Sequence, residues 1–281
     1  MPNPIEYQCP ICKAALTLQA CGKQYACPNR HSFDLAKEGY LNLLPVQHKS
    51  SLQPGDNKPM LSARRAFLEA GYYAQLAEAT TRMVAQHFPA QPLRLLDLGC
   101  GEGYYSRYLA KWLNTNHPLE QHGLDIAKFA VAAAAKNQPD GHFVVASSLR
   151  LPFPADYFDL VLRIFAPSNT DELRRVLKTS GLLLMVTPGP RHLWQLKQLI
   201  YADVQEHALT PELDSGFIAI DHQRIEYQIT PDVEHRNALL QMTPFAWQAS
   251  AEIQQTLATL ADFTVDVDFV LTLAKKVATK T

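Results

Sequence analysis

The feature of this sequence that most constrains its fold is a regular alternation of short apolar runs with helical segments, which starts at Leu93. The expected strands are residues 93–98, 122–126, 142–146, 158–164 and 182–187, and the expected helices between them are residues 104–113, 128–136 and 171–178. A strand that alternates with a helix in this way specifies a parallel sheet with helices on both faces. The sequence therefore predicts an α/β domain.

Three further segments have a readable pattern. Apolar residues recur at helical spacing from Met60 to His87, with an interruption near Gly71. Pro190 is suited to a first helical turn and predicts a long helix as far as about His207. Residues 264–274 predict a final strand, which we expect at an edge of the sheet.

A glycine-rich loop follows the first expected strand, with the sequence Asp97-Leu98-Gly99-Cys100-Gly101-Glu102-Gly103. Glycines at the carboxyl end of a strand allow the backbone to approach a ligand closely. The dinucleotide fingerprint G-x-G-x-x-G requires a third glycine where this chain has Tyr104. The pattern D-x-G-x-G-x-G is instead the form used by methyltransferases, so the loop predicts a site for S-adenosylmethionine.

Asp125 ends the second expected strand. A carboxylate at this position can accept hydrogen bonds from both hydroxyls of a ribose. The segment 146–149, after the third strand, is placed to border an adenine. Together these features predict a Rossmann-like class I fold for an S-adenosylmethionine-dependent methyltransferase.

Four of the five cysteines lie within the first 27 residues. Cys9 and Cys12 form one pair at a spacing typical of metal ligands, and Cys27 and His31 form a second pair. Four such ligands close a tetrahedral Zn²⁺ site without an open position, so we expect structural zinc rather than reduced thiols in a small core. Cys21 is an alternative fourth ligand that lacks a partner, and we interpret it as a spare.

The charges divide unevenly along the chain, although the net charge is only −1. Residues 1–65 hold eight Lys and Arg against four Asp and Glu, so the remainder is acidic. A basic segment on an acidic body fits a module that contacts nucleic-acid phosphate, although it is also compatible with ordinary scatter. The candidate phosphate contacts are Lys13, Lys23, Arg30, Lys49, Arg64 and Arg65.

The longest apolar runs, such as residues 181–186, are too short to cross a bilayer. Residues 1–6 have neither a basic start nor an apolar core, so we expect no signal peptide. A cytoplasmic protein without membrane contact is the expected localisation.

The chain from Cys9 to about Trp247 resembles the bacterial 23S rRNA (guanine-N1)-methyltransferase family, which contains zinc. Many methyltransferases share the glycine loop. The combination of the zinc-ligand pairs with the segments that begin at Gly39 and Gly189 is more specific for this family. The shared segments are Cys9-x-x-Cys12, Cys27-x-x-x-His31, residues 37–45, residues 54–56, residues 63–68, residues 187–193 and residues 241–247.

The resemblance implies methyl transfer from S-adenosylmethionine to N1 of a guanine in a hairpin loop of 23S rRNA. It also implies a homodimer whose N-terminal modules flank an RNA cleft. The changes of pattern along the chain divide it into a zinc-binding module at 1–35, a linker with helices at 36–92 and a methyltransferase domain at 93–281. The zinc ligands implied are Cys9, Cys12, Cys27 and His31. The cofactor contacts implied are Tyr73, Asp97, Gly99, Gly101, Glu102, Gly103, Asp125 and His192.

Two other functions remain open at this stage: methylation of a small metabolite, and RNA binding through zinc with an inactive methyltransferase domain. Many enzymes that methylate amino groups carry Asn/Asp-Pro-Pro-Tyr after the fourth strand, where this chain has Ile164-Phe165-Ala166-Pro167. This difference argues against an exocyclic amine as the target and leaves Phe165 as a stacking face. His192 is either a base or a cofactor contact, and the catalytic base is not identified.

Overall fold

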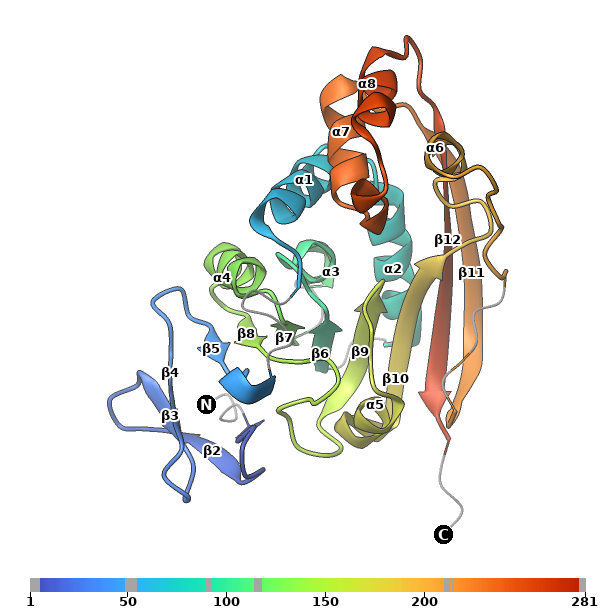
Figure 1. Cartoon of the computed structure of the whole chain (residues 1–281). Coiled ribbons are helices and arrows are strands. Elements are labelled where there is room, and N and C mark those ends of the chain that lie inside the picture. Colours follow the sequence, from blue (N-terminus) through green and yellow to red (C-terminus); the bar gives the residue numbers. More distant parts are fainter. Residues whose placement is uncertain are drawn as a thin grey trace.

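An eight-stranded sheet forms the centre of the molecule (Figure 1). The computed structural model describes residues 6–48, 55–88, 92–113, 118–209, 213 and 215–277. The sheet order is β11-β12-β10-β9-β6-β7-β8-β5. Its strands are β5 (Leu41–Asn42), β6 (Leu93–Leu98), β7 (Leu119–Asp125), β8 (His142–Val145), β9 (Phe158–Ile164), β10 (Leu177–Pro188), β11 (Phe217–Ile229) and β12 (Val265–Lys276).

The sheet is mixed, because β12 runs antiparallel to both of its neighbours, β10 and β11. The expectation that the last strand lies at an edge is therefore wrong. Ten consecutive residues of β12 are buried, whereas β11 forms the edge and exposes every second side chain along most of its length. We did not expect β11, because the predicted strands are apolar runs, whereas β11 alternates polar and apolar residues as half-buried strands do.

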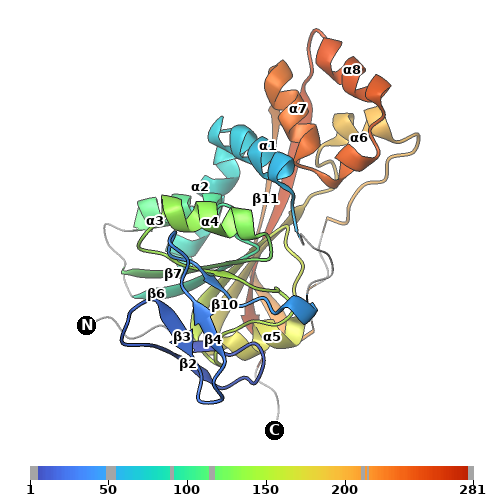
Figure 2. The same ribbon diagram turned by 60° about the vertical axis from the view of Figure 1, so that its left-hand side comes forward.

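Helices cover both faces of the sheet, as predicted (Figures 1 and 2). The helical segment expected from Met60 to His87 is divided at Gly71, whose φ is +86°. The helices are α1 (Lys58–Glu69), α2 (Ala74–His87), α3 (Tyr104–Leu113), α4 (Lys128–Asn137), α5 (Thr170–Val176), α6 (Trp194–Ile200), α7 (Val233–Gln241) and α8 (Ala251–Thr259), with short 3₁₀ helices η1 (Val46–His48) and η2 (Pro244–Trp247).

The long helix expected from Pro190 to His207 is much shorter than predicted. It begins only at Trp194, because Leu193 has a left-handed backbone with φ of 55°. The preceding turn is held against β12 by backbone bonds from Gly189 N–H to Asp268 O (2.8 Å) and from Leu193 N–H to Asp266 O (2.8 Å). Pairing with a neighbouring strand thus overrides the local helical preference of this segment.

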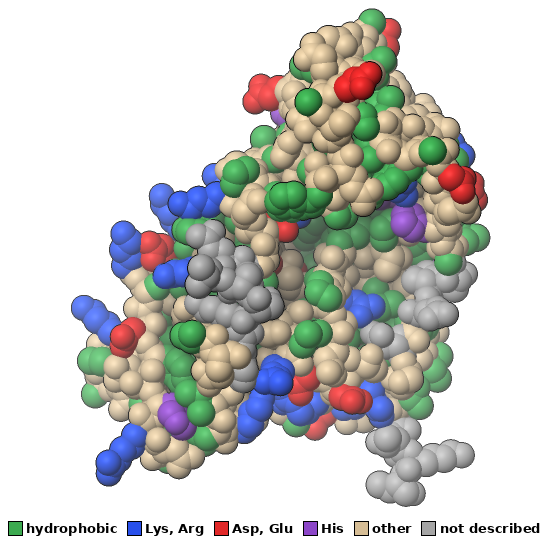
Figure 3. All heavy atoms as spheres, viewed as in Figure 1, with side chains coloured by type: hydrophobic (Ala, Val, Ile, Leu, Met, Phe, Trp, Pro, Cys, Tyr) green, Lys and Arg blue, Asp and Glu red, His purple; other side chains and the backbone are tan. Residues whose placement is uncertain are grey.

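The helices α1, α6, α7 and α8 gather in an upper lobe, beyond the ends at which β9 and β10 finish (Figures 1 and 2). Figure 3 shows a hollow between this lobe and the body of the molecule. The glycine loop leaves the sheet on the same side as the carboxyl ends of the parallel strands, where ligands of open α/β sheets bind.

A small antiparallel sheet of four strands, in the order β1-β2-β3-β4, forms the N-terminal module. Its strands are β1 (Tyr7–Gln8), β2 (Ala15–Leu18), β3 (Gln24–Ala26) and β4 (Ser32–Asp34). Tyr7 packs on Phe153 of the body with ring centroids 5.7 Å apart, and Gln8 N–H donates to Pro152 O at 2.9 Å. The chain then adds β5 to the large sheet, parallel to β8. The module is therefore packed against the body rather than tethered to it.

Among the described residues, no helix is long and apolar enough to span a membrane.

Phe153 joins the two parts of the molecule, and its removal tests how much this contact stabilises the fold. The side chain is fully buried and also packs on Phe158. We expect Phe153→Ala to lower the free energy of unfolding by about 3–5 kcal/mol, because it removes a large buried ring and leaves a cavity. Phe129→Ala is the matched control, since Phe129 is 44% exposed, and its cost should stay below about 1 kcal/mol. Equal unfolding midpoints in urea for the two variants would contradict this role.

Candidate zinc and cofactor sites

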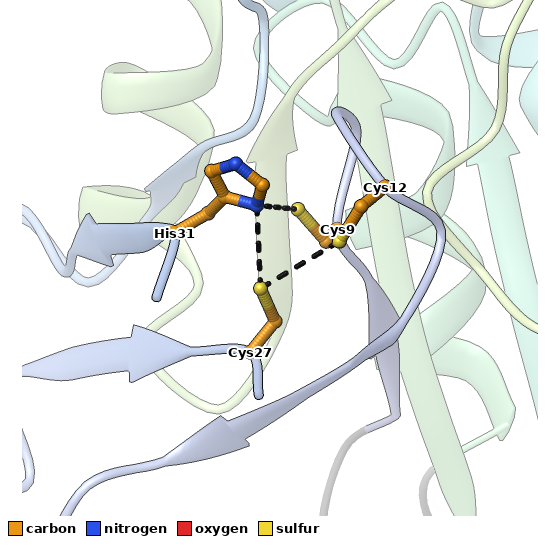
Figure 4. A group of neighbouring side chains, drawn as sticks. All are labelled: Cys9, Cys12, Cys27 and His31. Carbon is orange, nitrogen blue, oxygen red and sulfur yellow. Dashed lines mark hydrogen bonds between the residues drawn. The ribbon is translucent and has the colours of Figure 1, made fainter. Parts of the chain in front are cut away.

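The four predicted metal ligands, Cys9, Cys12, Cys27 and His31, come together in the N-terminal module (Figure 4). Their ligand atoms all lie within 4.8 Å of one another. His31 Nδ1 is 3.5 Å from Cys9 Sγ and 3.4 Å from Cys27 Sγ, and the Sγ atoms of Cys12 and Cys27 are 3.7 Å apart. A tetrahedron with Zn–S bonds of about 2.3 Å has edges of about 3.8 Å, so the donor set fits a zinc ion.

Two tight turns position these ligands. Cys9 follows β1, and its turn closes through a bond from Lys13 N–H to Cys9 O at 2.9 Å. Cys27 follows β3, and its turn closes through a bond from Arg30 N–H to Cys27 O at 3.0 Å. Lys13 and Arg30 both have left-handed backbones, with φ of 63° and 64°. Each knuckle therefore presents a cationic residue at its tip.

The cysteine environments differ within the cluster. The side chain of Asn29 and the backbone of Ala14 lower the pKa of Cys12 to about 6, whereas burial raises the pKa of Cys9. A zinc ligand must be a thiolate, and hydrogen bonds to the sulfur help to provide that form. Cys21 is exposed and is not a member of the cluster.

The glycine loop lies between β6 and α3. Gly99, Gly101 and Gly103 all have positive φ, at 73°, 54° and 74°. A Cβ atom on Gly99 would lie 2.5 Å from that of Ala166, whereas one on Gly101 would have no neighbour within 4 Å. The loop is thus packed against the segment after β9 at one end and open at Gly101, where its backbone can meet a ligand.

Asp125, at the end of β7, is joined directly to this loop. Its Oδ2 accepts a hydrogen bond from Gly101 N–H at 2.9 Å, and its Oδ1 accepts one from Ala127 N–H at 2.8 Å. Burial raises the pKa of Asp125, while these two N–H donors favour its charged form. Each carboxylate oxygen can accept a second hydrogen bond. The side chain is therefore oriented to receive two hydroxyl groups.

Two buried polar atoms near the loop, the Tyr73 hydroxyl and Asp97 Oδ2, have no hydrogen-bond partner in the described part of the chain. Burial raises the pKa of Asp97 to about 7 and raises that of Tyr73 well above its usual value. Buried polar groups without partners are costly, and their presence beside an open loop indicates a polar ligand. The amino-acid and ribose groups of S-adenosylmethionine supply such partners, so these residues fit the cofactor.

Glu102 contacts another protein side chain in this structure. Its two carboxylate oxygens accept hydrogen bonds from Nε and Nη2 of Arg65. Arg64 pairs with Asp56 and also donates to Met242 O at 3.2 Å. Both of these candidate phosphate contacts are therefore paired with carboxylates of this chain. The side chain of Arg65 neutralises an acid of the loop itself, and Arg64 connects α1 to the end of α7.

His192 is buried beside the open end of the site. Its Nδ1 accepts a hydrogen bond from the Asp268 N–H at 3.3 Å, and its ring stacks on Phe165 with centroids 6.0 Å apart. Burial lowers the pKa of His192 to about 3. The ring is therefore neutral at physiological pH, with its proton on Nε2. This arrangement favours a hydrogen-bond donor over a general base.

Asp268, in β12, positions the segment that carries His192, and the sequence reasoning missed it. The carboxylate is fully buried and accepts hydrogen bonds from Arg224 Nε (2.9 Å), Arg224 Nη2 (2.8 Å) and Arg191 N–H (2.9 Å). Burial raises the pKa of Asp268, but Arg224 outweighs burial and holds it below its usual value. The available signal was the pair Asp266 and Asp268 within an otherwise apolar strand, because buried acids require partners.

Fold and site together define a class I S-adenosylmethionine-dependent methyltransferase with an N-terminal zinc ribbon. A family model described as "RlmA, N-terminal" matches residues 7–52, and a model described as "Methyltransferase domain" matches residues 95–181. The YxjB protein of Bacillus subtilis is 32% identical over 275 residues, which are 94% of this chain and 96% of that protein.

A second relative, the 23S rRNA (guanine(748)-N(1))-methyltransferase of Streptomyces fradiae, is 32% identical over 92% of each chain. The protein therefore belongs to the 23S rRNA (guanine-N1)-methyltransferase family. The malonyl-[acyl-carrier protein] O-methyltransferase of Halorhodospira halophila is 30% identical, but over only 56% of this chain and 58% of that protein.

The zinc cluster predicts one zinc ion per chain. Cys27→Ala should release the ion, because it removes one of four ligands from a closed site. Cys21→Ala is the control and should retain a full equivalent, since Cys21 is exposed outside the cluster. Metal analysis of the purified variants by plasma mass spectrometry checks both outcomes. Full zinc content in Cys27→Ala would refute this ligand set.

The position of Asp125 predicts a loss of cofactor binding in Asp125→Ala. Removal of an acceptor for two hydroxyls should cost about 1.5–3 kcal/mol, or about 10- to 150-fold in the Kd for S-adenosylmethionine. Asp140→Ala removes an exposed acid after α4 and should leave the Kd unchanged. Calorimetric titration measures both constants. An unchanged Kd for Asp125→Ala would show that the cofactor lies elsewhere.

Proposed function

We propose that this protein transfers a methyl group from S-adenosylmethionine to N1 of a guanine in a hairpin loop of 23S rRNA. The observation that supports this most strongly is the match, over 92% of each chain, to the Streptomyces fradiae relative, whose name states methylation of a 23S rRNA guanine at N1. The zinc cluster lies within residues 7–52, which match the family model described as "RlmA, N-terminal", whereas the H. halophila relative matches only 56% of the chain.

We further propose the cofactor contacts, which lie on four segments of the fold. When bound, S-adenosylmethionine supplies an electrophilic methyl group on a sulfonium, and the protein aligns the acceptor with it. The open backbone at Gly101 and the carboxylate of Asp125 bind the nucleoside end, and the unpartnered hydroxyl of Tyr73 meets the amino-acid end. The full set is Tyr73, Asp97, Gly99, Gly101, Glu102, Gly103, Asp125 and His192, of which Asp97 offers its unpartnered Oδ2 to the cofactor and Glu102 is held by Arg65.

Phe165 provides a surface for the acceptor base. The residue directly follows β9, has a left-handed backbone with φ of 53°, and leaves 46% of its surface exposed. Strained backbones of non-glycine residues are found preferentially at functional sites. One face of the ring lies on His192, and the next residue, Ala166, packs on Gly99. The free face is therefore held beside the cofactor loop, where it can stack on a guanine.

The neutral state of His192 suits this reaction. A protonated imidazole next to a sulfonium would place two positive charges together in a buried site. Because Asp268 N–H occupies Nδ1, the ring presents Nε2–H to the site, where it can donate to an oxygen of the base or of the cofactor. The side chain therefore orients a reactant and does not remove the N1 proton.

The zinc module supplies cations for the RNA backbone. Lys13, Lys23 and Arg30 are all exposed on it, and the first and last stand at the tips of the two knuckles. Figure 3 shows Lys and Arg side chains along the same side of the molecule as this module. Lys49, the remaining candidate, lies outside the described residues. We retain the limits 1–35, 36–92 and 93–281 for the three parts, and a cytoplasmic homodimer as the working form.

Primer extension on ribosomal RNA tests the function. A methyl group on guanine N1 blocks Watson–Crick pairing and stops reverse transcriptase. We expect one stop in a hairpin loop of 23S rRNA from the source cells, no stop in a strain that lacks the gene, and a restored stop with the wild-type gene. The Asp125→Ala gene should not restore it. An identical stop pattern in the two strains would exclude 23S rRNA N1 methylation and favour a small-molecule substrate.

A further inference from the structure

Trp247 leaves 76% of its surface exposed, the second-largest exposed fraction among the large hydrophobic residues described. It ends the 3₁₀ helix η2, which links α7 to α8. The match to the RNA-methylating family runs through this segment, yet neither the zinc site nor the cofactor site uses the indole. An exposed tryptophan that the core does not require indicates a surface for a partner.

The turn that carries Trp247 is rigid. Thr243, buried at its start, donates from Oγ1 to Leu240 O at 2.8 Å. At its end, the Phe245 carbonyl accepts from Gln248 N–H at 2.9 Å and from Ala249 N–H at 3.2 Å. The indole is therefore presented on a fixed backbone, so ordering it on binding costs little conformational entropy.

The same turn is tied to both sides of the proposed methyl-transfer site. On one side, Arg64 donates to Met242 O and lies close enough to Asp125 to favour the charged carboxylate. On the other side, Phe245 lies 5.9 Å from the ammonium of Lys197, on the helix that follows His192. Both ribbon views place the link between α7 and α8 at the lower end of the upper lobe, next to the hollow seen in Figure 3.

The chemistry of the reaction indicates that the indole of Trp247 contacts an unstacked RNA base. N1 lies on the Watson–Crick edge, so the target guanine must leave any pairing and stacking before it reaches the methyl group. A nucleotide next to it then loses a stacking neighbour. An aromatic side chain replaces that neighbour for any base, because every base has a π-face.

A second copy of the chain is a poorer occupant for this position. Stable dimers bury about 800 Å² on each partner around an apolar centre. The residues that follow Trp247 in the chain are the exposed Gln248, the buried Ala249 and the exposed Ser250, whose side chain caps α8. The residues before it are the exposed Pro244 and the half-buried Phe245 and Ala246. One exposed indole on a short turn is suited to a single base.

We propose that Trp247 stacks on an RNA base next to the target guanine and holds the opened loop at the rim of the site. This proposal rests on the proposed function, since it takes the same RNA as the substrate.

Two measurements on the full-length zinc-loaded enzyme test it. The first is tryptophan fluorescence with S-adenosylhomocysteine bound, during titration with a transcript of the 23S rRNA hairpin. We expect the RNA to quench the wild-type signal, and the quenching to be largely absent in Trp247→Phe. Trp112→Phe is the matched control, because Trp112 is 65% exposed on α3, and its quenching should equal that of the wild type.

The second measurement is steady-state methylation of the transcript. Trp247→Ala should raise the KM for RNA about 5- to 150-fold, the range expected for one lost stacked base, with an unchanged KM for S-adenosylmethionine. Trp247→Phe should recover most of the loss, because it restores an aromatic face. Equal thermal midpoints and zinc contents ensure that the variants are folded.

Unchanged quenching in Trp247→Phe, or an unchanged KM for RNA in Trp247→Ala, would overturn the proposal. A shift of Trp247→Ala from dimer to monomer in sedimentation, with RNA KM retained, would assign the indole to a second copy and also overturn it. A wild-type enzyme that fails to methylate the hairpin would instead refute the proposed function. The two failures are therefore distinguishable.

Discussion

The buried carboxylate of Asp268 is the interaction on which the geometry of the catalytic side depends. It lies in the buried antiparallel strand β12, next to the edge strand, where an unpaired charge would be very costly, and Arg224 from the edge strand neutralises it. The carboxylate also accepts a hydrogen bond from Arg191 N–H, which fixes the turn that begins at Gly189. A Cβ atom on Gly189 would lie 2.0 Å from the carboxylate. Only glycine fits there. One ion pair thereby connects the sheet edge, the turn and the orientation of His192.

The N-terminal zinc module and the methyltransferase body are stabilised in different ways. The N-terminal module is too small to bury a sufficient core, and four metal ligands provide its stability. The body buries a large core, and three of its strained or unsatisfied residues are Phe165, Tyr73 and Asp97. We infer that a ligand bound at the glycine loop compensates for these three.

Much of this arrangement could be predicted from the sequence, because the relevant signals are local. The glycine loop, the metal-ligand pairs and the parallel strands each depend on residues within a short window. The remainder depends on long-range contacts. No local pattern indicates that Arg224 neutralises Asp268, that Arg65 binds Glu102, or that the turn after Gly189 pairs with β12. The edge strand β11 was also not predicted. Its polar residues face solvent, so the strand lacks the continuous apolar run by which the other strands were predicted.

The short strand β5 limits how far this protein can be shortened from its N-terminus. By pairing with β8, Leu41 and Asn42 cover one edge of the large sheet, and Leu41 is almost fully buried there. An uncovered edge strand offers free backbone groups to other chains and promotes aggregation. The N-terminal segment is therefore part of the large sheet's protection against self-association. Removal of the N-terminal segment through Asn42 would therefore expose the backbone of β8 and favour aggregation of the remaining chain.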